Sequence, residues 1–343
     1  MLKIVQEGIP IMKNEKISMK DIAEMSGVSI ATVSRVINQN GRFSSETEQR
    51  VMSIIEKYDF RPNELARGLR ANKAQAVGVI VPDITNEFFA CVVREIEIEL
   101  LKKGYMAIVC DTNEAMDLEK KYIAMLKSLQ VGGIIYIAGD ANVKCIENIP
   151  TVYVDREPMM IEDMMASTFI GSDNYQGGYI ATRRLIDAGK KEIVLVLHKK
   201  SLTTQKRRLD GYKQAIRDAG MKFNENLIIK VENVDMDHGY EVTKKIFESE
   251  LNPDGIFYSA DILAIGGMRY LNKMKIEIPE QVSIIGFDDI PLSSQITPAL
   301  TTVKQSYTEF GHLASESIVK MMNGDADYRK YILSVQLVER ETV

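Results

Sequence analysis

From Val77 onward, short β-rich runs alternate with helical segments, and this alternation constrains the fold more than any other feature of the chain. Strands that alternate with helices predict βαβ units, and therefore parallel sheets covered by helices on both faces. The pattern returns from Thr182 to Gly286, so we expect two α/β lobes. Ligands of such lobes bind in the crevice at the carboxyl ends of the strands. The first series reads "AVGVIVPD", "FFACVVREIEIELLKKG", "YMAIVCD", "LEKKYIAMLKSLQ" and "VGGIIYIAG".

Residues 18–61 have a different pattern, with apolar residues at helical spacing over segments of about two turns. Ser18 and Asp21 have the spacing of a capping box before a first helix. Gly27 supplies a tight turn, and Ser29 caps a second helix that runs to about residue 38. A third helix is expected within "FSSETEQRVMSIIEKYDF". Helices this short are marginal alone, so they must share one small core.

The expected inward residues of these three helices leave one face of the second helix free. Small and hydroxyl side chains on that face permit close approach to phosphates, and Arg35 suits a guanine edge. This arrangement predicts a DNA-binding helix-turn-helix, although an ordinary three-helix packing module with a polar surface has the same spacing. The inward set is Ile22, Ala23, Met25, Val33, Val36, Ile37, Val51, Ile54 and Ile55, and the free face holds Ser29, Ile30, Ala31, Thr32, Ser34 and Arg35.

Charge and composition agree with this division. Residues 12–73 hold 11 Lys/Arg and 8 Asp/Glu, a net of +3 in a chain of net −5, which favours contact of this module with a polyanion. The chain has no apolar run long enough to span a membrane, and its first residues lack the apolar core of a signal peptide. Cys91, Cys110 and Cys145 are scattered, as expected for reduced thiols in the cytoplasm.

The sequence contains no pattern typical of an enzyme or of a cofactor site. His198, His238 and His312 are far apart and lack the spacing of metal ligands. Glycine-rich nucleotide-binding and G-x-S-x-G hydrolase motifs are absent. We therefore expect neither catalysis nor a cofactor.

The motif "DIAEMSGVSIATVSRVINQN…RPNELARGLR" closely resembles the DNA-binding headpiece of the LacI/GalR family of bacterial transcription regulators. The resemblance continues from about residue 17 to 340 through "VGVIVPDITNEFFA", "SDNYQGGYIATRRLIDAGKKEI", "IPEQVSIIGFDDI" and "TPALTTVKQ". It implies a helix-turn-helix headpiece (18–61) joined to a two-lobed effector domain (76–343) similar to periplasmic binding proteins.

The resemblance assigns DNA-binding roles on the second helix. Ile30 and Ala31 occupy the variable positions that discriminate operator bases, and Arg35 occupies a base-contacting position. Ile30 and Ala31 can offer only apolar contact, such as to a thymine methyl. Phe60 stands where the family usually has Tyr, so that hydroxyl contact to a phosphate is lost. The positions that touch phosphates or adjacent bases are Ser29, Thr32, Ser34, Asn38 and Arg42.

Residues 62–75 resemble the family's hinge helix, which forms only on operator DNA. Asn63 can cap this short helix, and Leu69 stands where the family inserts a leucine into the minor groove. A plain flexible linker is the alternative. Residues 1–17 are expected to be a disordered extension, with Met12 a possible start of translation.

The expected effector site draws on strand ends and one helix. Asp and Arg at strand ends that face a cleft suit the bidentate binding of polyol hydroxyls. Each such residue could equally form a salt bridge or a helix cap that only shapes a loop. By resemblance, one lobe spans about 76–172 and 303–323, and the other about 173–300 and 330–343. The expected effector residues are Asp83, Phe88, Asp155, Arg156, Arg208 and Asp288.

Several positions depart from the family pattern around this site. Asn233-Val234 replaces a frequent aromatic wall, Ala260-Asp261 replaces Asn-Asp, and His198-Lys199 replaces Gly-Pro. A cationic run has also appeared, which either is a solvated rim or faces an anionic ligand such as a phosphorylated sugar. The run consists of Lys199, Lys200, Lys206, Arg207 and Arg208.

We therefore expect a cytoplasmic homodimer that reads a pseudo-palindromic operator and is gated by a sugar or sugar phosphate. Effector binding would change the angle between the lobes and so the spacing of the two hinges. The resemblance implies repression rather than activation, because repression is the more frequent activity in this family. The rival interpretations are a ligand-binding protein that no longer uses DNA, and an enzyme.

Overall fold

The structure is a computed structural model that describes residues 17–60, 76–137, 149–158, 167–200, 202–325 and 329–343. The chain forms two compact units, residues 1–73 and 74–343, and each is considered by itself. The expected N-terminal extension before residue 17 and the expected hinge with Asn63 and Leu69 lie outside the described residues, as does Cys145.

The first unit contains three short helices, α1 (Met19–Ser26), α2 (Ile30–Ile37) and α3 (Ser45–Lys57). The predicted capping box is present, because the Ser18 hydroxyl accepts from the Asp21 amide while the Asp21 carboxylate accepts from Ser18. The Ser18 hydrogen bonds lower the pKa of Asp21. Gly27 ends α1 with φ 67°, a left-handed conformation that favours glycine.

The core of this unit holds the predicted apolar residues with one exception. Ile22, Val33 and Val51 are fully buried. Met25 was expected to face inward, but its side chain is 48% exposed, so that prediction is wrong. Ser26 is buried in its place and donates its hydroxyl to the Ile22 carbonyl at 2.6 Å, which satisfies a polar group inside an apolar core.

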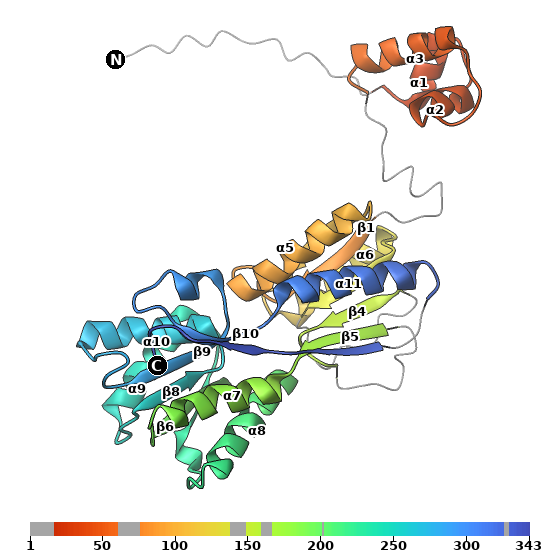
Figure 1. Ribbon diagram of the computed structural model, residues 1–343. Helices are drawn as coiled ribbons and strands as arrows, with labels where there is room; N and C mark the ends of the chain where they lie inside the picture. The colour runs from red at the N-terminus through yellow and green to blue at the C-terminus, as the bar shows by residue number, and fades with distance from the viewer. Residues whose placement is uncertain (1–16, 61–75, 138–148, 159–166, 201, 326–328) are drawn as a thin grey trace, which may run out of the picture. The chain divides into compact units, whose positions relative to one another are not determined.

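The first lobe of the second unit is built on a six-stranded sheet in the order β11-β5-β4-β3-β1-β2, and every neighbouring pair is parallel. Its helices include α5 (Glu87–Lys102), α6 (Met116–Ser128) and α11 (Tyr307–Met322), and Figure 1 shows α11 running beside α5. The strands are β1 (Ala76–Val81), β2 (Met106–Asp111), β3 (Gly133–Ile137), β4 (Thr151–Val154), β5 (Ser167–Ser172) and β11 (Arg329–Leu333).

The second lobe repeats this plan with the order β12-β10-β9-β8-β6-β7, in which only β12 runs antiparallel to its neighbour. The strands are β6 (Ile193–His198), β7 (Ile228–Val231), β8 (Gly255–Tyr258), β9 (Ser283–Asp288), β10 (Thr301–Lys304) and β12 (Gln336–Val338). The helices are α7 (Asn174–Asp187), α8 (Thr203–Asp218), α9 (Met236–Glu248) and α10 (Asp261–Met274), with 3₁₀ turns η1 (Glu225–Leu227) and η2 (Pro291–Ser294).

Burial explains why these segments form parallel sheets. Every residue of β1 and of β6 is buried, as expected for central strands covered on both faces. In both sheets the strand order reverses beside the first strand of the lobe, β1 or β6, which is the switch point where ligands of doubly wound folds bind. The predicted class, an α-helical headpiece with a two-lobed α/β domain, is confirmed.

The chain passes between the two sheets three times, but two expected boundaries are wrong. Residues 303–304 were assigned to the first lobe, whereas β10 pairs with β9 of the second sheet through Lys304. Residues 330–333 were assigned to the second lobe, whereas β11 pairs with β5, with Tyr331 beside Ile170. The physical reason is that every residue of β5 is buried, so its backbone groups need a partner strand, and the more exposed β11 becomes the edge strand in its place.

Candidate functional site

The free face of α2 carries the residues expected to meet DNA. Ile30, Ala31, Arg35 and the following Asn38 are exposed, and Ile30 keeps 45% of its apolar side chain in solvent. Ser29 is also exposed and caps the helix through the Thr32 amide at 3.1 Å. Arg42 is exposed beyond the helix, while Thr32 and Ser34 are half-buried. The structure thus gathers all eight described candidates on or beside one short helix.

Two of these side chains are held by local contacts. The Asn38 amide donates to the Ser34 carbonyl at 2.7 Å, which fixes the end of α2. A Cβ placed on Gly41 would lie 3.2 Å from Cδ of Arg35, so the glycine leaves room for the arginine stem. Gly41 also has φ 107°, where glycine is favoured. The Arg35 guanidinium forms no ion pair with the residues that the structure describes.

The second unit contains a cavity of about 380 Å³ between the carboxyl ends of its two sheets, a size typical of small-molecule sites. All six predicted effector residues line it: Asp83, Phe88, Asp155, Arg156, Arg208 and Asp288. Asp83 follows β1, Asp155 follows β4, and Asp288 ends β9, so the chain reversal after each strand delivers a carboxylate to the same place.

Arg208 is the centre of a buried polar network. Its side chain is only 4% exposed, and its Nε donates to Asn174 Oδ1 at 2.8 Å while Nη1 donates to the Ser259 carbonyl. The guanidinium stacks on the Phe287 ring with its carbon 3.5 Å from the ring centroid. Glycine at position 178 permits this placement, because a Cβ there would lie 2.1 Å from the Arg208 carbonyl oxygen.

Asp155 and Asp288 hold equivalent places in the two lobes. Both residues adopt positive φ, 72° and 118°, a conformation that costs about 1–3 kcal/mol in non-glycine residues and clusters at binding sites. Burial raises the pKa of each carboxyl, and the charge of Arg208 acts in the opposite direction. The Gln305 amide donates to Asp288 Oδ1 at 2.7 Å.

Asp83 is partly engaged in its own loop. Its Oδ1 accepts from the Thr85 amide at 2.8 Å and from the Thr85 hydroxyl at 2.6 Å. This is the loop-shaping role that was the alternative to ligand binding, although the residue also lines the cavity. Phe88 packs edge-on against Phe89 and forms an apolar part of the lining with it.

Five polar atoms of the cavity lining are buried and have no hydrogen-bond partner among the described residues. Buried polar groups are almost always paired, so such a cluster points to a missing ligand or water. The atoms belong to both lobes and meet in one cavity. They are Asp155 Oδ1, Arg156 Nε, His198 Nδ1, Ser259 Oγ and Gln305 Oε1.

The cationic run does not converge on the cavity. Lys199 pairs with Glu232 at 2.8 Å, and Lys200 bridges the lobes to Glu114. Lys206 and Arg207 line a separate cavity of about 540 Å³. Arg208 alone of the run lines the first cavity, whose charged lining is rich in acids: Asp83, Glu114, Asp155, Asp235 and Asp288 against Arg156 and Arg208.

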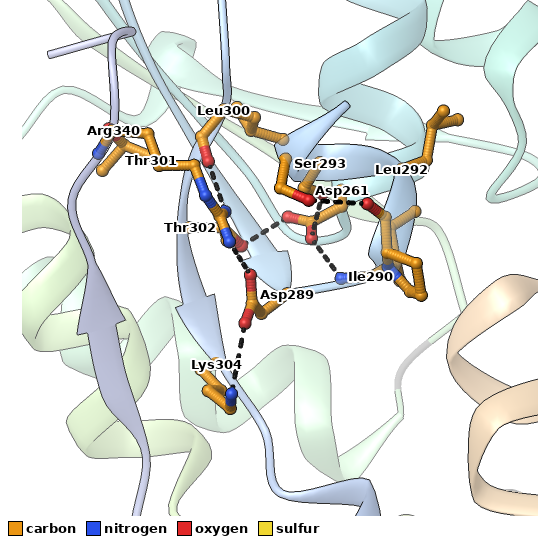
Figure 2. A network of polar contacts seen from close by, with 12 residues as sticks. Asp261, Asp289, Ile290, Leu292, Ser293, Leu300, Thr301, Thr302, Lys304 and Arg340 are labelled. Carbon is orange, nitrogen blue, oxygen red and sulfur yellow. Dashed lines mark hydrogen bonds and ion pairs between the residues drawn. The ribbon is translucent and has the colours of Figure 1, made fainter. Parts of the chain in front are cut away.

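Asp261 is a buried carboxylate that holds the turn after β9 through Ile290 and Ser293 (Figure 2). It accepts from the Ile290 amide at 2.9 Å, from the Ser293 hydroxyl at 2.7 Å and from the Thr302 hydroxyl. A Cβ on Gly286 would lie 2.1 Å from Asp261 Oδ1, so glycine is needed there. Asp289 follows in the same network and pairs with Arg340 at 2.5 Å.

Sequence reasoning missed several lining residues. Glu114 and Ser259 lie in no quoted motif, and Gln305 ends the segment "TPALTTVKQ" without an assigned role, so only positions just after strands could have suggested these residues. His198 and Asn233-Val234 were noted as departures from a family pattern and now prove to line the cavity. Within the described residues, no helix is long and apolar enough to cross a membrane, and no group of His, Cys, Asp and Glu could hold a metal ion.

Comparison with known proteins agrees with this architecture. Residues 18–63 match the family "Bacterial regulatory proteins, lacI family", and residues 182–343 match a periplasmic binding protein-like domain. The chain is 32% identical to the ribose operon repressor of Halalkalibacterium halodurans over 95% of this chain and 96% of that protein.

Solved structures extend the likeness. A periplasmic binding protein/LacI transcriptional regulator from Alkaliphilus metalliredigens in complex with D-xylulofuranose has a TM-score of 0.70 and 30% identity, covering 79% of this chain and 99% of that one. The lac repressor dimer bound to operator and the anti-inducer ONPF has a TM-score of 0.81 over 96% and 99% of the two chains; at 21% identity it supports the fold alone. The chain therefore belongs to the lacI family of bacterial regulatory proteins and is a DNA-binding transcription regulator.

Proposed function

We propose that this regulator is a repressor that binds a pseudo-palindromic operator as a homodimer and is controlled by a neutral sugar bound between its lobes. The observation that carries the proposal is the acid-rich cavity with five unpartnered polar atoms. Its excess of carboxylates disfavours a phosphorylated sugar, because two buried or half-buried arginines would have to offset both the carboxylates and the ligand.

The DNA-binding side of the proposal rests on α2. Arg35 would hold a guanine edge through its two-pronged guanidinium, and Ile30 and Ala31 would contact thymine methyl groups. Ser29, Thr32, Ser34, Asn38 and Arg42 would contact phosphates or adjacent bases, and Asn63 and Leu69 would act in the hinge. The exposed apolar side chain of Ile30 supports this, since the headpiece core does not use it.

The nature of the relatives supports a pentose as effector. One relative is named a ribose operon repressor, and a similar solved structure holds D-xylulofuranose. A cavity of about 380 Å³ suits a ligand of this size. Asp155, Asp288 and Arg208 would bind its hydroxyls, Arg156 and Asp83 would contribute further polar contacts, and Phe88 would contact its apolar face.

Contacts between the lobes supply a route from effector to DNA. Lys200 pairs with Glu114, the Leu292 amide donates to the Glu87 carboxylate at 3.3 Å, and the Glu157 amide donates to the Thr203 hydroxyl at 3.3 Å. Each contact joins one lobe to the other, so a change in the angle between the lobes would alter it. A ligand that binds one angle better shifts the population toward it, and so changes how the two headpieces of a dimer are spaced.

A gel-shift assay with DNA fragments flanking the protein's own gene tests this function. We expect one fragment to be retarded, and D-ribose or D-xylulose to change its affinity while their phosphates do not. If no fragment is retarded, the result favours a ligand-binding protein that no longer uses DNA. If only the sugar phosphates change the affinity, the neutral-sugar assignment is wrong. The proposal places the protein in the bacterial cytoplasm and includes no turnover, so the sugar should be recovered unchanged.

A further inference from the structure

We propose that His198 determines effector specificity by accepting a hydrogen bond from a ligand hydroxyl through its Nδ1 atom. The proposal rests on the proposed function, because it concerns the same cavity. His198 ends β6 and stands where the family usually has a small residue, so this contact belongs to the present chain.

The geometry fixes which ring nitrogen carries the proton. His198 Nε2 lies 2.8 Å from the backbone carbonyl oxygen of Glu232. A carbonyl oxygen can only accept, so Nε2 is the donor and, in the neutral ring, Nδ1 is left with a lone pair. The Nδ1 atom is buried and has no partner among the described residues, and the residue lines the cavity.

The surroundings hold the main chain at His198 and favour the neutral ring. The His198 amide donates to Gln205 Oε1 at 3.2 Å. Burial lowers the pKa of His198 and the nearby Arg156 and Lys200 act in the same direction, while the Glu232 carbonyl and the charge of Glu114 oppose them. Glu114 is itself paired with Lys200 and Arg156, and the Glu232 carboxylate is paired with Lys199.

The other unpartnered atoms require the same kind of ligand. Gln305 uses its amide nitrogen on Asp288, so its Oε1 remains an acceptor, and Asp155 Oδ1 is an acceptor when ionised. Three acceptors therefore face the cavity with one N–H donor on Arg156 and one hydroxyl on Ser259. A polyhydroxy ligand can donate to all three acceptors, whereas an ionised phosphate has no proton to give them.

Titration calorimetry with D-ribose and D-xylulose tests the contact in wild type, His198→Ala and His198→Asn. His198→Ala should weaken the tighter of the two sugars roughly 3- to 10-fold, as expected for one lost hydrogen bond. His198→Asn should recover most of the affinity, because its side-chain oxygen can reach the Nδ1 position. In a series of monodeoxy analogues, the one lacking the contacting hydroxyl should lose affinity for wild type but not for His198→Ala.

The dependence on pH gives a second readout. Protonation of Nδ1 removes the acceptor, so wild-type affinity should fall as the pH is lowered from 7.5 through the pKa of His198, which burial lowers from its usual value. The raised pKa values of Asp155 and Asp288 also contribute to that fall, and they remain in His198→Asn. The variant should therefore lose less affinity than wild type over the same range. Equal loss in both proteins, with no deoxy analogue distinguishing them, would overturn the proposal while leaving the sugar effector in place.

If neither pentose binds, that result counts against the proposed effector class. Nitrogen-15 NMR of the ligand-free full-length protein then tests the role of His198 by itself. The chain has three histidines, so loss of one ring signal in His198→Asn assigns it. We expect the neutral Nε2–H tautomer at pH 7. A protonated Nδ1 at that pH, in either the neutral or the charged ring, would refute the acceptor role.

Discussion

Arg35 has no ion-pair partner among the described residues, and Gly41 leaves room for its aliphatic stem. Arg35→Ala should lower operator affinity by roughly 1–3 kcal/mol and relax the preference at one base pair, because a bidentate base contact would be lost. Competition gel shifts with single-base operator variants measure both effects.

Arg42→Ala is the matched control for this prediction. Arg42 is exposed just beyond α2 and is expected to contact phosphate, so its loss should weaken all sequences alike and reduce the salt dependence of binding. If Arg35→Ala also weakens every operator variant equally, then Arg35 contacts only the backbone of the DNA.

The buried carboxyl of Asp261 should make folding stability depend on pH. Burial raises its pKa from 3.8 to about 7, although three donors stabilise the ionised form. Between these two values the folded state binds more protons than the unfolded state, so this group makes stability fall as pH rises from about 4 to 7. Thermal unfolding at pH 5 and pH 7.5 should show a smaller change in Asp261→Asn than in wild type.

Asp237→Asn provides a comparison for the previous experiment. The Asp237 side chain is 90% exposed and pairs only loosely with Arg269 at 3.6 Å. Its pH profile should match that of wild type. Profiles of Asp261→Asn and Asp237→Asn that coincide would show that Asp261 does not hold its proton in the folded protein.

Among the helices of the headpiece, α3 begins at a cap that lies outside the expected DNA contacts. Ser44 Oγ accepts from the Thr47 amide at 3.2 Å and satisfies an amide that has no partner within the helix. Ser44→Ala should therefore reduce headpiece stability by about 1 kcal/mol. Hydrogen exchange of α3 amides in the full-length protein measures this, and Ser53→Ala, later in the same helix, should have a smaller effect.

The headpiece elements were predictable because local chemistry fixes them. Ser18, Gly27 and Ser29 set the ends of α1 and α2 through hydrogen bonds within a few residues. The prediction that Met25 faces inward was wrong because a helix of two turns has few inward positions. The neighbouring Ser26 is buried instead, since its hydroxyl bonds to a carbonyl of its own helix. The assignment of β11 failed because pairing with β5 joins residues far apart in the chain.

The effector site was predictable where a residue stands directly at a strand end. Asp155 and Asp288 met this condition, and Arg208 was found through family resemblance. Gln305 was not found, because it reaches the cavity only after the chain leaves β10 for the other lobe. Lys206 and Arg207 were grouped with Arg208 by sequence, but their places on α8 turn them toward a different cavity.

As an assembly, the protein should dimerise through an apolar surface at the β2 edge of the first lobe. Exposed apolar side chains occur on three consecutive elements, the end of α5, β2 and α6, and exposed apolar patches mark protein interfaces. Met125→Lys with Leu129→Lys should convert the dimer to a monomer and reduce binding of a full operator toward that of a half-site. The surface consists of Leu101, Met106, Val109, Met116, Leu118, Met125 and Leu129.

Sedimentation at micromolar concentration measures the change in assembly. Met52→Lys, which alters an exposed apolar residue of the headpiece, is the control and should remain dimeric. A double variant that still sediments as a dimer would place the interface elsewhere, for example on the second lobe alone.

The three passages of the chain between the lobes also determine the order in which parts of the protein can fold during synthesis. Residues 329–333 complete the first sheet and residues 336–338 the second, while buried Thr342 ties β9 to β10 through the Ile284 carbonyl and the Thr301 amide. Neither lobe can close its sheet until these residues have left the ribosome. The headpiece emerges first and is complete within residues 17–60. A nascent chain would therefore carry a folded DNA-reading module before it can sense its effector.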